Sequence, residues 1–315
     1  MDPQVALQAA LTGLAQGAVY GLVALGFTLV HRLVRVVWFA HGDLVVSAAF
    51  VGILVTVGRT PVVSTPSAAR GAGQVVVTLV VAAALAVAGY LFAVRPFLRA
   101  TQSPHPSAVT GWVAASLAVG LLLRESLGLV FSRESYAVAD PLRLDRLVGT
   151  DGVIGLGGVT VPARVVGVVV IGLVVAVATE RFVARTRTGA AMRAVADDPD
   201  TAALMGIPAE RVVLLAFVIA GLLAGLAGLL VVPAGPATVA GGVVLGLKGA
   251  AAAVVGRLGS LAGAVVAGLG LGVVESLAVA SDRFGPAYAD VLLLAVLVAT
   301  LAVRPEGRRA ALVVE

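Results

Sequence analysis

Several long apolar runs, separated by short polar segments, constrain the fold of this chain more than any other feature. Each run holds about 17–25 residues, the length that a helix needs to cross a bilayer. None shows the period-two alternation of membrane β-barrel strands. Hydrophobic residues make up 60% of the 315 and charged residues 12%, more apolar surface than a soluble domain could bury. The sequence predicts an all-α polytopic membrane protein, a bundle of about 8–9 transmembrane helices in one domain.

The predicted spans lie near residues 5–30, 43–57, 74–94, 108–131, 164–179, 211–232, 261–280 and 287–303. A shorter apolar run at 243–255, which holds Lys248, is either a tilted crossing or a re-entrant half-helix, since its length fits both. Glycines at four-residue spacing let another helix approach closely. They are Gly13/Gly17/Gly21, Gly221/Gly225, Gly259/Gly263 and Gly268/Gly272.

A long polar segment, about residues 181–210, interrupts the apolar runs and carries the signals of a short helix. Asp198 suits the N-cap, Pro199 the first helical position and Asp200 the first turn, where its charge is favourable against the helix dipole. Gly206 fits the left-handed position that ends a helix. The segment therefore predicts a stand-alone helix of about two turns, ending at Met205. A short, rigid helix outside the bilayer is suited to docking on a soluble partner.

The arginines predict the orientation, because cytoplasmic loops carry an excess of basic residues. We expect the 181–210 loop and the C-terminus in the cytoplasm, with the loop about 132–162 and the N-terminus outside. The 132–162 loop is expected to form a hairpin or short helix over one mouth of the bundle. The predicted location is a bacterial inner membrane. The basic residues used are Arg32, Arg35, Arg95, Arg99, Arg185, Arg187, Arg193, Arg304, Arg308 and Arg309.

Catalytic and cofactor-binding motifs are not found. The chain has no cysteine and three histidines, so neither a thiolate site nor a histidine metal cluster is expected. There is no G-x-x-x-x-G-K-[ST], G-x-S-x-G or H-E-x-x-H motif. Its net charge of +5 comes from scattered arginines and one lysine, which favours loop anchors over a nucleic-acid surface. We expect no enzyme activity, cofactor, metal or nucleic-acid partner, and transport fits better.

A few polar residues inside the spans are candidates for a substrate pathway. Gln16 and Tyr20 are four residues apart on one face of the first span, where they either line a conduit or bond to another helix. His41 and Asp43 line the inner mouth of that conduit or anchor the interface beside Trp38. Asp43 is also a candidate cap for the second span.

Two further sites carry charge. Glu275 is the acid deepest inside a span, so it should face the bundle, paired or protonated. It serves either as a proton relay or as a hydrogen-bonding group between helices. Arg124 and Glu125 lie near the end of the fourth span. Neighbours point about 100° apart on a helix, so they need not pair, and we expect both to reach for the interface.

Four blocks of sequence resemble one family. They are GLAQGAVYGLVALGFTLV followed by FAHGD, TRTGAAMRAVADDPDTAALMGI, GLKGAAAAVVGRLGSLAGAVVAGLGLGVVES and RPEGR, in this order. Together they make the chain similar to the permease subunits of high-affinity branched-chain amino acid ABC importers. The resemblance implies translocation of branched-chain or related hydrophobic amino acids. It also implies a second permease, expected to be a different chain, two cytoplasmic ATPase subunits and an extracytoplasmic substrate-binding protein.

The resemblance also implies a role for the short polar helix. ABC importer permeases often present a motif like E-A-A-x-x-x-G to their ATPase, and here Asp200, Thr201 and Ala202 followed by Gly206 reproduce its spacing. The predicted ATPase-coupling residues are Asp198, Pro199, Asp200, Thr201, Ala202, Ala203, Leu204, Met205 and Gly206.

Two other functions remain open at this point. Relatives in this broad group also carry amides or urea. An ion-coupled secondary carrier or channel would use Glu275, and inverted repeats around broken helices would favour it. The sequence shows no clear second copy of the FAHGD block.

Overall fold

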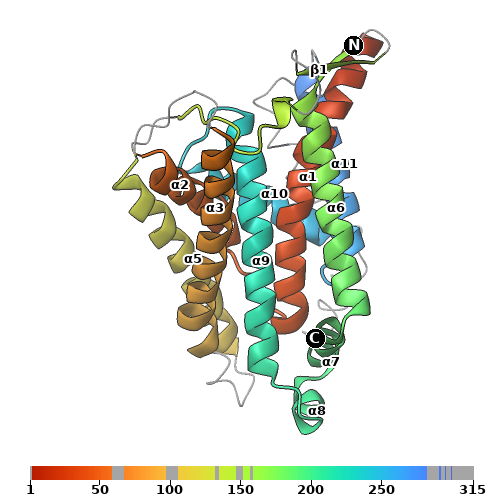
Figure 1. The fold of residues 1–315 in the computed structure, drawn as a ribbon. Helices are drawn as coiled ribbons and strands as arrows, with labels where there is room; N and C mark the ends of the chain where they lie inside the picture. Colours follow the sequence, from red (N-terminus) through yellow and green to blue (C-terminus); the bar gives the residue numbers. More distant parts are fainter. Residues whose placement is uncertain are drawn as a thin grey trace.

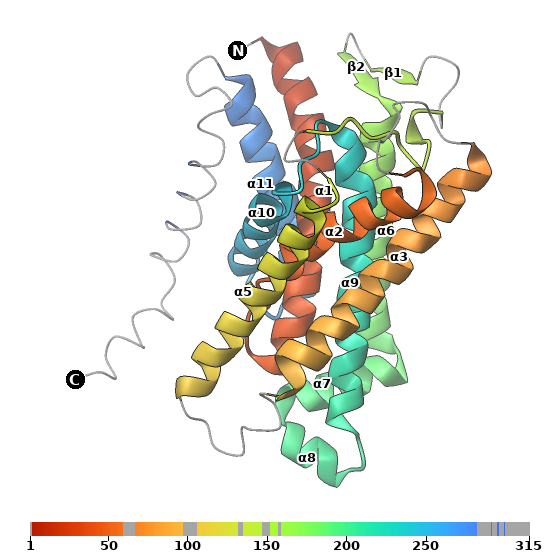
Figure 2. The same cartoon turned by 90° about the vertical axis from the view of Figure 1, so that its left-hand side faces the viewer.

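The structure, a computed structural model, describes residues 2–58, 67–96, 106–131, 135–146, 152–156 and 159–281, with the isolated helical positions 291, 295 and 299. Helices side by side form an elongated bundle (Figure 1). Turned by 90°, the same bundle shows a β-hairpin at one end and two short helices at the other (Figure 2). The fold is all-α and polytopic apart from that hairpin.

Five helices in the described part of the chain are long and apolar enough to cross a membrane. They agree with the predicted spans, although most begin or end several residues further out than the apolar runs alone indicate. They are α1 (Pro3–Val34), α3 (Ala68–Gly89) with its π-helical extension η1 (Tyr90–Val94), α6 (Ala163–Arg185), α9 (Ala209–Val231) with the 3-10 turn η3 (Val232–Ala234), and α11 (Leu261–Ala280).

The remaining helices of the bundle are α5 (Pro106–Gly128) and two shorter ones, α2 (His41–Thr56) and α10 (Gly241–Val255). A turn that contains Arg257 and Gly259, both with positive φ, reverses the chain after α10. Ser260 then caps α11 by accepting a hydrogen bond from the Gly263 amide. The predicted span at 287–303 lies outside the described residues except for positions 291, 295 and 299, and the basic tail lies outside them entirely.

The loop predicted to form a hairpin does so. β1 (Val153–Leu156) pairs antiparallel with β2 (Val159–Pro162), in a register that places Val153 opposite Pro162. A short 3-10 turn, η2 (Leu144–Arg146), precedes it. The hairpin lies at the end of the bundle that also holds the N-terminus, opposite α8 (Figure 1).

The glycine stripe on α1 packs directly on α11. A Cβ on Gly17 would lie 2.6 Å from the Leu269 Cα, and one on Gly272 would lie 2.3 Å from the Gly17 backbone nitrogen. Such contact needs small residues on both helices. The predicted close approach is confirmed for α1 and for Gly268/Gly272, but Gly259 lies in the turn before α11 rather than on a helix face.

One expectation for the segment after α1 is wrong, and burial there is greater than the composition indicates. Trp38 and His41 are each only 1% exposed, because the segment after α1 turns back into the bundle. There Trp38 stacks near Phe217 of α9 at 4.8 Å between ring centroids. Asp43 does not cap α2: the helix begins at His41 after Ala40, and Asp43 lies in its first turn.

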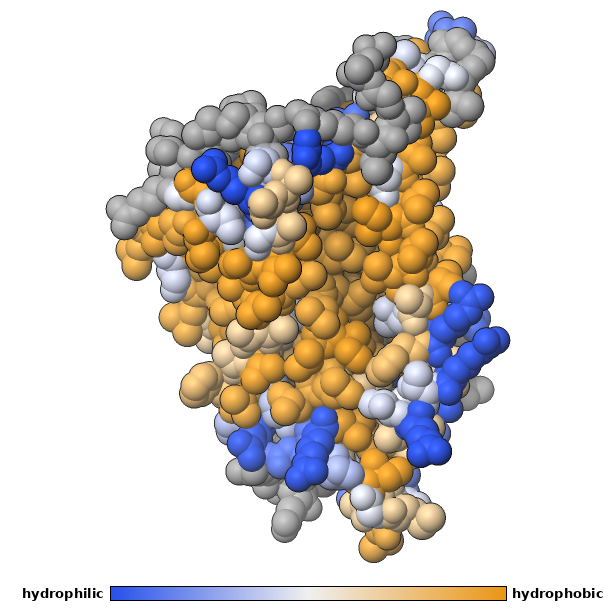
Figure 3. Space-filling view, viewed as in Figure 1, coloured by the Kyte–Doolittle hydropathy of each residue, from blue (hydrophilic) through white to orange (hydrophobic). Residues whose placement is uncertain are grey.

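The outer surface is compatible with a lipid environment. In the face shown in Figure 3, apolar residues form a continuous belt, and hydrophilic residues gather toward the two ends. Large exposed aliphatic side chains on this bundle include Val76 and Val80 of α3 and Val170 and Val174 of α6. Exposed aliphatic faces of this kind are expected where a helix contacts lipid tails.

Candidate functional site

The polar segment folds as two consecutive short helices, of which the sequence predicted the second. α7 (Arg187–Asp197) begins at Thr186, whose hydroxyl accepts a hydrogen bond from the Gly189 amide. α8 (Pro199–Leu204) follows after Asp198. It ends one residue earlier than expected, with Met205 at the C-cap. α7 was not predicted from the sequence, because its large apolar side chains are few and are separated by arginines and alanines.

The residues that predict the start and the end of α8 occupy the expected positions. The Asp198 carboxylate accepts hydrogen bonds from the amides of Asp200 (3.0 Å) and Thr201 (3.1 Å), and from the Thr201 hydroxyl at 2.6 Å. These bonds, led by the one from the Thr201 side chain, lower the pKa of Asp198 below its ordinary value. Gly206 has φ +80°. The amides of Gly206 and Ile207 bond back to the carbonyls of Ala203 and Ala202, which is the Schellman arrangement.

Contacts with the long helices hold the two short helices in place. Arg35, at the end of α1, donates a 2.8 Å hydrogen bond to the carbonyl of Ala196 near the end of α7. Arg193 of α7 donates to the carbonyl of Ala184, at the end of α6. The buried side chains of Met192 and Val195 add an apolar contact to the same core. These contacts join α7 to α1 and α6.

The tip of α8 exposes apolar side chains. Leu204 is 88% exposed and Met205 is 78% exposed, whereas Ala202 faces inward and is buried. Both views place α8 beyond the end of the long helices (Figures 1 and 2). Large apolar side chains that project from a polar segment are typical of a protein contact.

The second feature of interest lies inside the bundle, where α2 and α10 begin against each other. A Cβ on Gly42 would lie 2.3 Å from the Gly246 Cα and 2.4 Å from the Gly242 carbonyl oxygen. Both helices start after an alanine, Ala40 or Ala240, and neither start is capped by a side chain. In both helices a glycine, Gly42 or Gly242, follows two residues after the N-cap alanine. Short helices that begin inside a bundle are a feature of membrane transport proteins.

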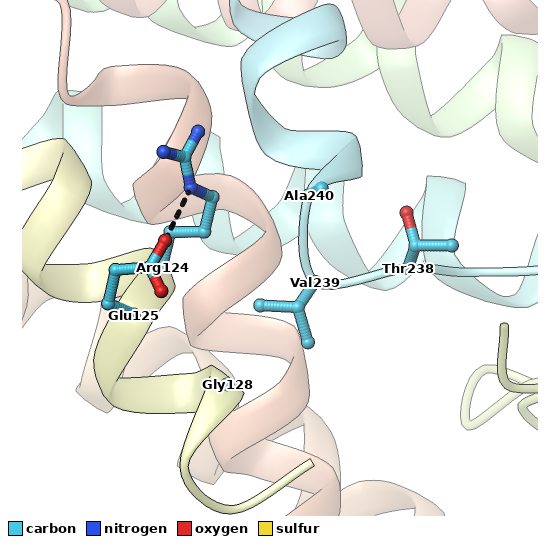
Figure 4. Close-up of a pocket in the computed structure, with 6 residues that line it drawn as sticks. All are labelled: Arg124, Glu125, Gly128, Thr238, Val239 and Ala240. Atoms are coloured by element: carbon cyan, nitrogen blue, oxygen red, sulfur yellow. Dashed lines mark ion pairs between the residues drawn. The ribbon is translucent and has the colours of Figure 1, made fainter. Parts of the chain in front are cut away.

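A cavity of about 280 Å³ lies beside the start of α10, between it and the end of α5. Figure 4 shows Arg124 and Glu125 of α5 on one side and the segment Thr238–Ala240 on the other. The Arg124 Nε is 3.5 Å from the Glu125 carboxylate, and the two side chains are 31% and 56% exposed. The two neighbours do form an ion pair, which helical geometry alone did not require. They also line a cavity, which the sequence did not indicate.

Asp43 lies between the two elements that enclose this cavity. Its Oδ2 would be 2.6 Å from a Cβ on Gly120 of α5, and its Oδ1 would be 3.2 Å from one on Gly242 of α10. The Arg124 guanidinium is close enough to interact electrostatically with the Asp43 carboxylate. The Asp43 Oδ1 atom is buried and has no hydrogen-bond partner among the described residues.

Glu275 has partners that the sequence did not identify. Its carboxylate accepts a 2.9 Å hydrogen bond from the Tyr20 hydroxyl of α1 and forms a 2.6 Å ion pair with Lys248 of α10. The Lys248 and Glu275 side chains are only 13% and 10% exposed. The ion pair joins α10 to α11, and whether Glu275 is a proton relay or a hydrogen-bonding group between helices stays a prediction.

The predicted pathway residues do not come together at one place. Tyr20 is buried and bonded to Glu275, whereas Gln16, one turn earlier, is exposed. His41 lies in the core against Phe27, with ring centroids 4.9 Å apart. Asp43 lies beside Gly120 of α5 and Gly242 of α10, in the two helices that flank the cavity. The role of all four in a pathway stays a prediction. The sequence alone gave no reason to group Arg124 with Thr238, which line one cavity, or Lys248 with Glu275, which form an ion pair.

Within the described ranges, no group of three acidic or histidine side chains is placed to hold a metal ion. The junction of two short helices inside the bundle and the protruding polar helix at its end are features of a polytopic α-helical membrane transport protein. The chain belongs to the family described as branched-chain amino acid transport system / permease component, whose model matches residues 9–301. The resemblance inferred from the four sequence blocks is confirmed.

Curated relatives carry consistent names. The permease protein BraD of a high-affinity branched-chain amino acid transport system in Pseudomonas aeruginosa is 29% identical over 96% of this chain and 94% of its own length. The LivH permease of the corresponding system in Escherichia coli K12 is 28% identical over 96% and 94%. A probable LivH from Methanocaldococcus jannaschii is 29% identical over 91% and 87%. All are named as transport permeases rather than enzymes.

One solved structure, PsaBC from Streptococcus pneumoniae in complex with Fab, aligns with 97% of this chain and 94% of its own. Its TM-score of 0.47 and sequence identity of 14% are too low to support an argument about the fold.

Proposed function

We propose that this protein is the membrane-spanning permease subunit of an ABC importer that translocates branched-chain or related hydrophobic amino acids. It works with a second permease of different sequence, two cytoplasmic ATPase subunits and an extracytoplasmic substrate-binding protein. The α8 end of the bundle and the C-terminus face the cytoplasm across a bacterial inner membrane, and the hairpin end faces outward. Three arginines in or next to α7 support this orientation, because basic loops stay on the cytoplasmic side.

One observation carries the proposal: a capped helix projects from the bundle, is bonded to it, and exposes Leu204 and Met205 at its tip. In the proposed assembly these two side chains enter a groove on an ATPase subunit. ATP-driven closure of the two ATPases then moves α7–α8 as a rigid body. The Arg35–Ala196 hydrogen bond transmits this movement to α1.

The direct test is reconstitution of the permease with its candidate ATPases and binding protein in proteoliposomes. We expect uptake of radiolabelled leucine that requires ATP and is insensitive to a proton gradient. Uptake driven by the gradient without ATP would favour an ion-coupled carrier instead. Uptake of urea or a short amide in place of leucine would keep the importer and change its substrate class.

A variant separates coupling from assembly. Gly206→Val places a β-branched side chain at φ +80° with open space around it, so only the end of α8 is strained. We expect ATP-driven uptake to fall at least tenfold, while membrane insertion and ATPase activity persist. The matched control is Gly58→Val, just after α2, where φ is +102° and the space is also open. Normal uptake by the Gly206 variant would remove the coupling role of α8.

A further inference from the structure

The cavity between α5 and α10 presents opposite charges to the same space. Arg124 and Glu125 line it from α5, and Thr238, Val239 and Ala240 line it from the segment before α10. A cation and an anion a few ångströms apart complement a ligand that itself carries both charges. An α-amino acid has this form at neutral pH, with a carboxylate and an ammonium group on one carbon.

The start of α10 adds a second feature that favours a carboxylate. Ala240 is its N-cap residue and makes no side-chain cap hydrogen bond, so the partially positive end of this 15-residue helix faces the cavity wall. The buried Asp43 Oδ1, without a hydrogen-bond partner in the described residues, lies beside Gly242 in the first turn of the same helix. The junction therefore contains a buried acceptor oxygen that the described part of the chain does not satisfy, and this oxygen suits the ammonium group of such a ligand rather than its carboxylate.

An apolar hollow adjoins the charged cavity. It has a volume of about 310 Å³ and shares Thr238 with the first cavity. Val46 of α2, Val232 of η3 and Leu245 of α10 are among its lining residues. A free aliphatic amino acid is smaller than either volume. A charged cavity beside an apolar one suits a ligand with a zwitterionic head and a branched hydrocarbon side chain.

We propose that this cavity is a transient binding site for the zwitterionic head of the amino acid in transit. The substrate carboxylate contacts the Arg124 guanidinium and the N-terminus of α10, and the ammonium group contacts Glu125. The aliphatic side chain enters the adjoining hollow at Thr238. The assignment depends on the proposed function, since it names where the imported amino acid pauses within this permease.

The first test uses the complete reconstituted transporter with saturating binding protein. In the Arg124→Gln variant we expect leucine uptake to fall at least tenfold, while ATP hydrolysis stimulated by the binding protein stays within about twofold of the wild type, because the coupling helix is intact. Arg124→Lys keeps the charge and should retain an intermediate rate. Arg181→Gln, on the exposed face of α6, is the matched control and should leave uptake unchanged.

A charge exchange distinguishes binding from a merely structural ion pair. The Arg124→Glu/Glu125→Arg double variant preserves the pair but reverses its polarity relative to α10. If the pair only stabilises α5, this variant should recover wild-type uptake, and that recovery would overturn the proposal. If the pair binds substrate, uptake should stay as low as in Arg124→Gln.

A second test needs no variant of the charged residues. The chain has no cysteine, so Thr238→Cys introduces the permease's sole thiol. We expect saturating leucine, delivered by the binding protein with ATP, to slow the alkylation of this thiol several-fold. The control is Ser126→Cys, on α5 but in a different hollow with Phe92 and Leu122, where leucine should have no effect.

The outcomes of the two proposals can be separated. If wild-type proteoliposomes show no ATP-dependent leucine uptake, the proposed function fails. If they transport leucine while Arg124→Gln transports normally, or while leucine leaves alkylation of the Thr238→Cys variant unchanged, only the site assignment fails.

Discussion

The N-terminus of α8 is capped by a side chain, whereas the N-termini of α2 and α10 are not. The first amides of any helix lack partners within that helix. At α8 the Asp198 carboxylate accepts hydrogen bonds from two of them. At α2 and α10 no side chain caps the start, and glycines bring the two starts into backbone contact inside the bundle.

This difference matches what each region contacts. α8 lies at the end of the molecule and is capped by residues of its own sequence. The α2–α10 junction depends on contacts between distant helices and lies beside a cavity. The first arrangement agrees with the coupling role proposed for α8, and the second with the binding site proposed at the cavity.

The largest loss of stability is expected from a substitution in the Lys248–Glu275 ion pair, which joins α10 to α11. Glu275→Gln removes the carboxylate that pairs with the buried Lys248 ammonium, which should cost about 3–5 kcal/mol of stability. The Lys248→Met/Glu275→Gln double variant removes both charges and should recover most of that loss. Thermal unfolding in detergent, followed by tryptophan fluorescence, measures both. If the single and double variants unfold at the same temperature, the ion pair is not what anchors α10.

A smaller effect is expected at the contact between the two helix starts. Gly42→Ala adds a Cβ where the Gly246 Cα is only 2.3 Å away, and overpacking of this kind costs about 1–3 kcal/mol. Gly73→Ala on α3 is the control, because no atom lies within 4 Å of its Cβ position, and it should be neutral or slightly stabilising. The same unfolding assay compares them. A Gly42 variant as stable as the Gly73 variant would mean that the helix starts separate without cost.

The exposed tip of α8 should matter for assembly and not for folding. Leu204→Ser with Met205→Ser should weaken ATPase association about a hundredfold or more, because burial of each such side chain contributes about 1.5–3 kcal/mol. The unfolding temperature of the isolated permease should not change. Leu129→Ser, at a residue 90% exposed just after α5, serves as the control. Association is measured by titration of the ATPase into permease in nanodiscs, and unchanged affinity would exclude these side chains from the interface.

The smallest effect concerns pH. Hydrogen bonds lower the pKa of Asp198 below its ordinary 3.8, so its capping contribution is fully present above that value and is lost as pH falls through the lower, folded pKa. Between pH 5 and 8 we expect no change in α8. Thr201→Val removes the strongest of these bonds and should raise the pKa toward 3.8. A carboxyl NMR titration, with the Asp198 signal assigned by its loss in Asp198→Asn, measures the shift, and an unaltered pKa would contradict it.

The parts of the fold predicted correctly are those that depend on neighbouring residues. Helices α9 and α11 follow from long apolar runs, the second of which contains Glu275, and α8 follows from Asp198, Pro199 and Gly206 within about two turns of chain. The glycines of α1, which repeat every four residues, also predicted that another helix packs closely on α1. The sequence did not show that α11 is the partner, because any helix with a matching stripe would satisfy the same pattern.

Tertiary structure alone decided the interior of the molecule. Lys248 and Glu275 are 27 residues apart and belong to different helices, so their pairing depends on how α10 sits against α11. Trp38 and His41 carried the composition of an interface, yet the chain turns inward there and buries both. Propensity and capping act within about a turn of helix, whereas burial and charge pairing depend on which faces meet when the whole bundle packs. For that reason the sequence determined the spans and the protruding helix, and only the assembled bundle determined the cavity beside Arg124.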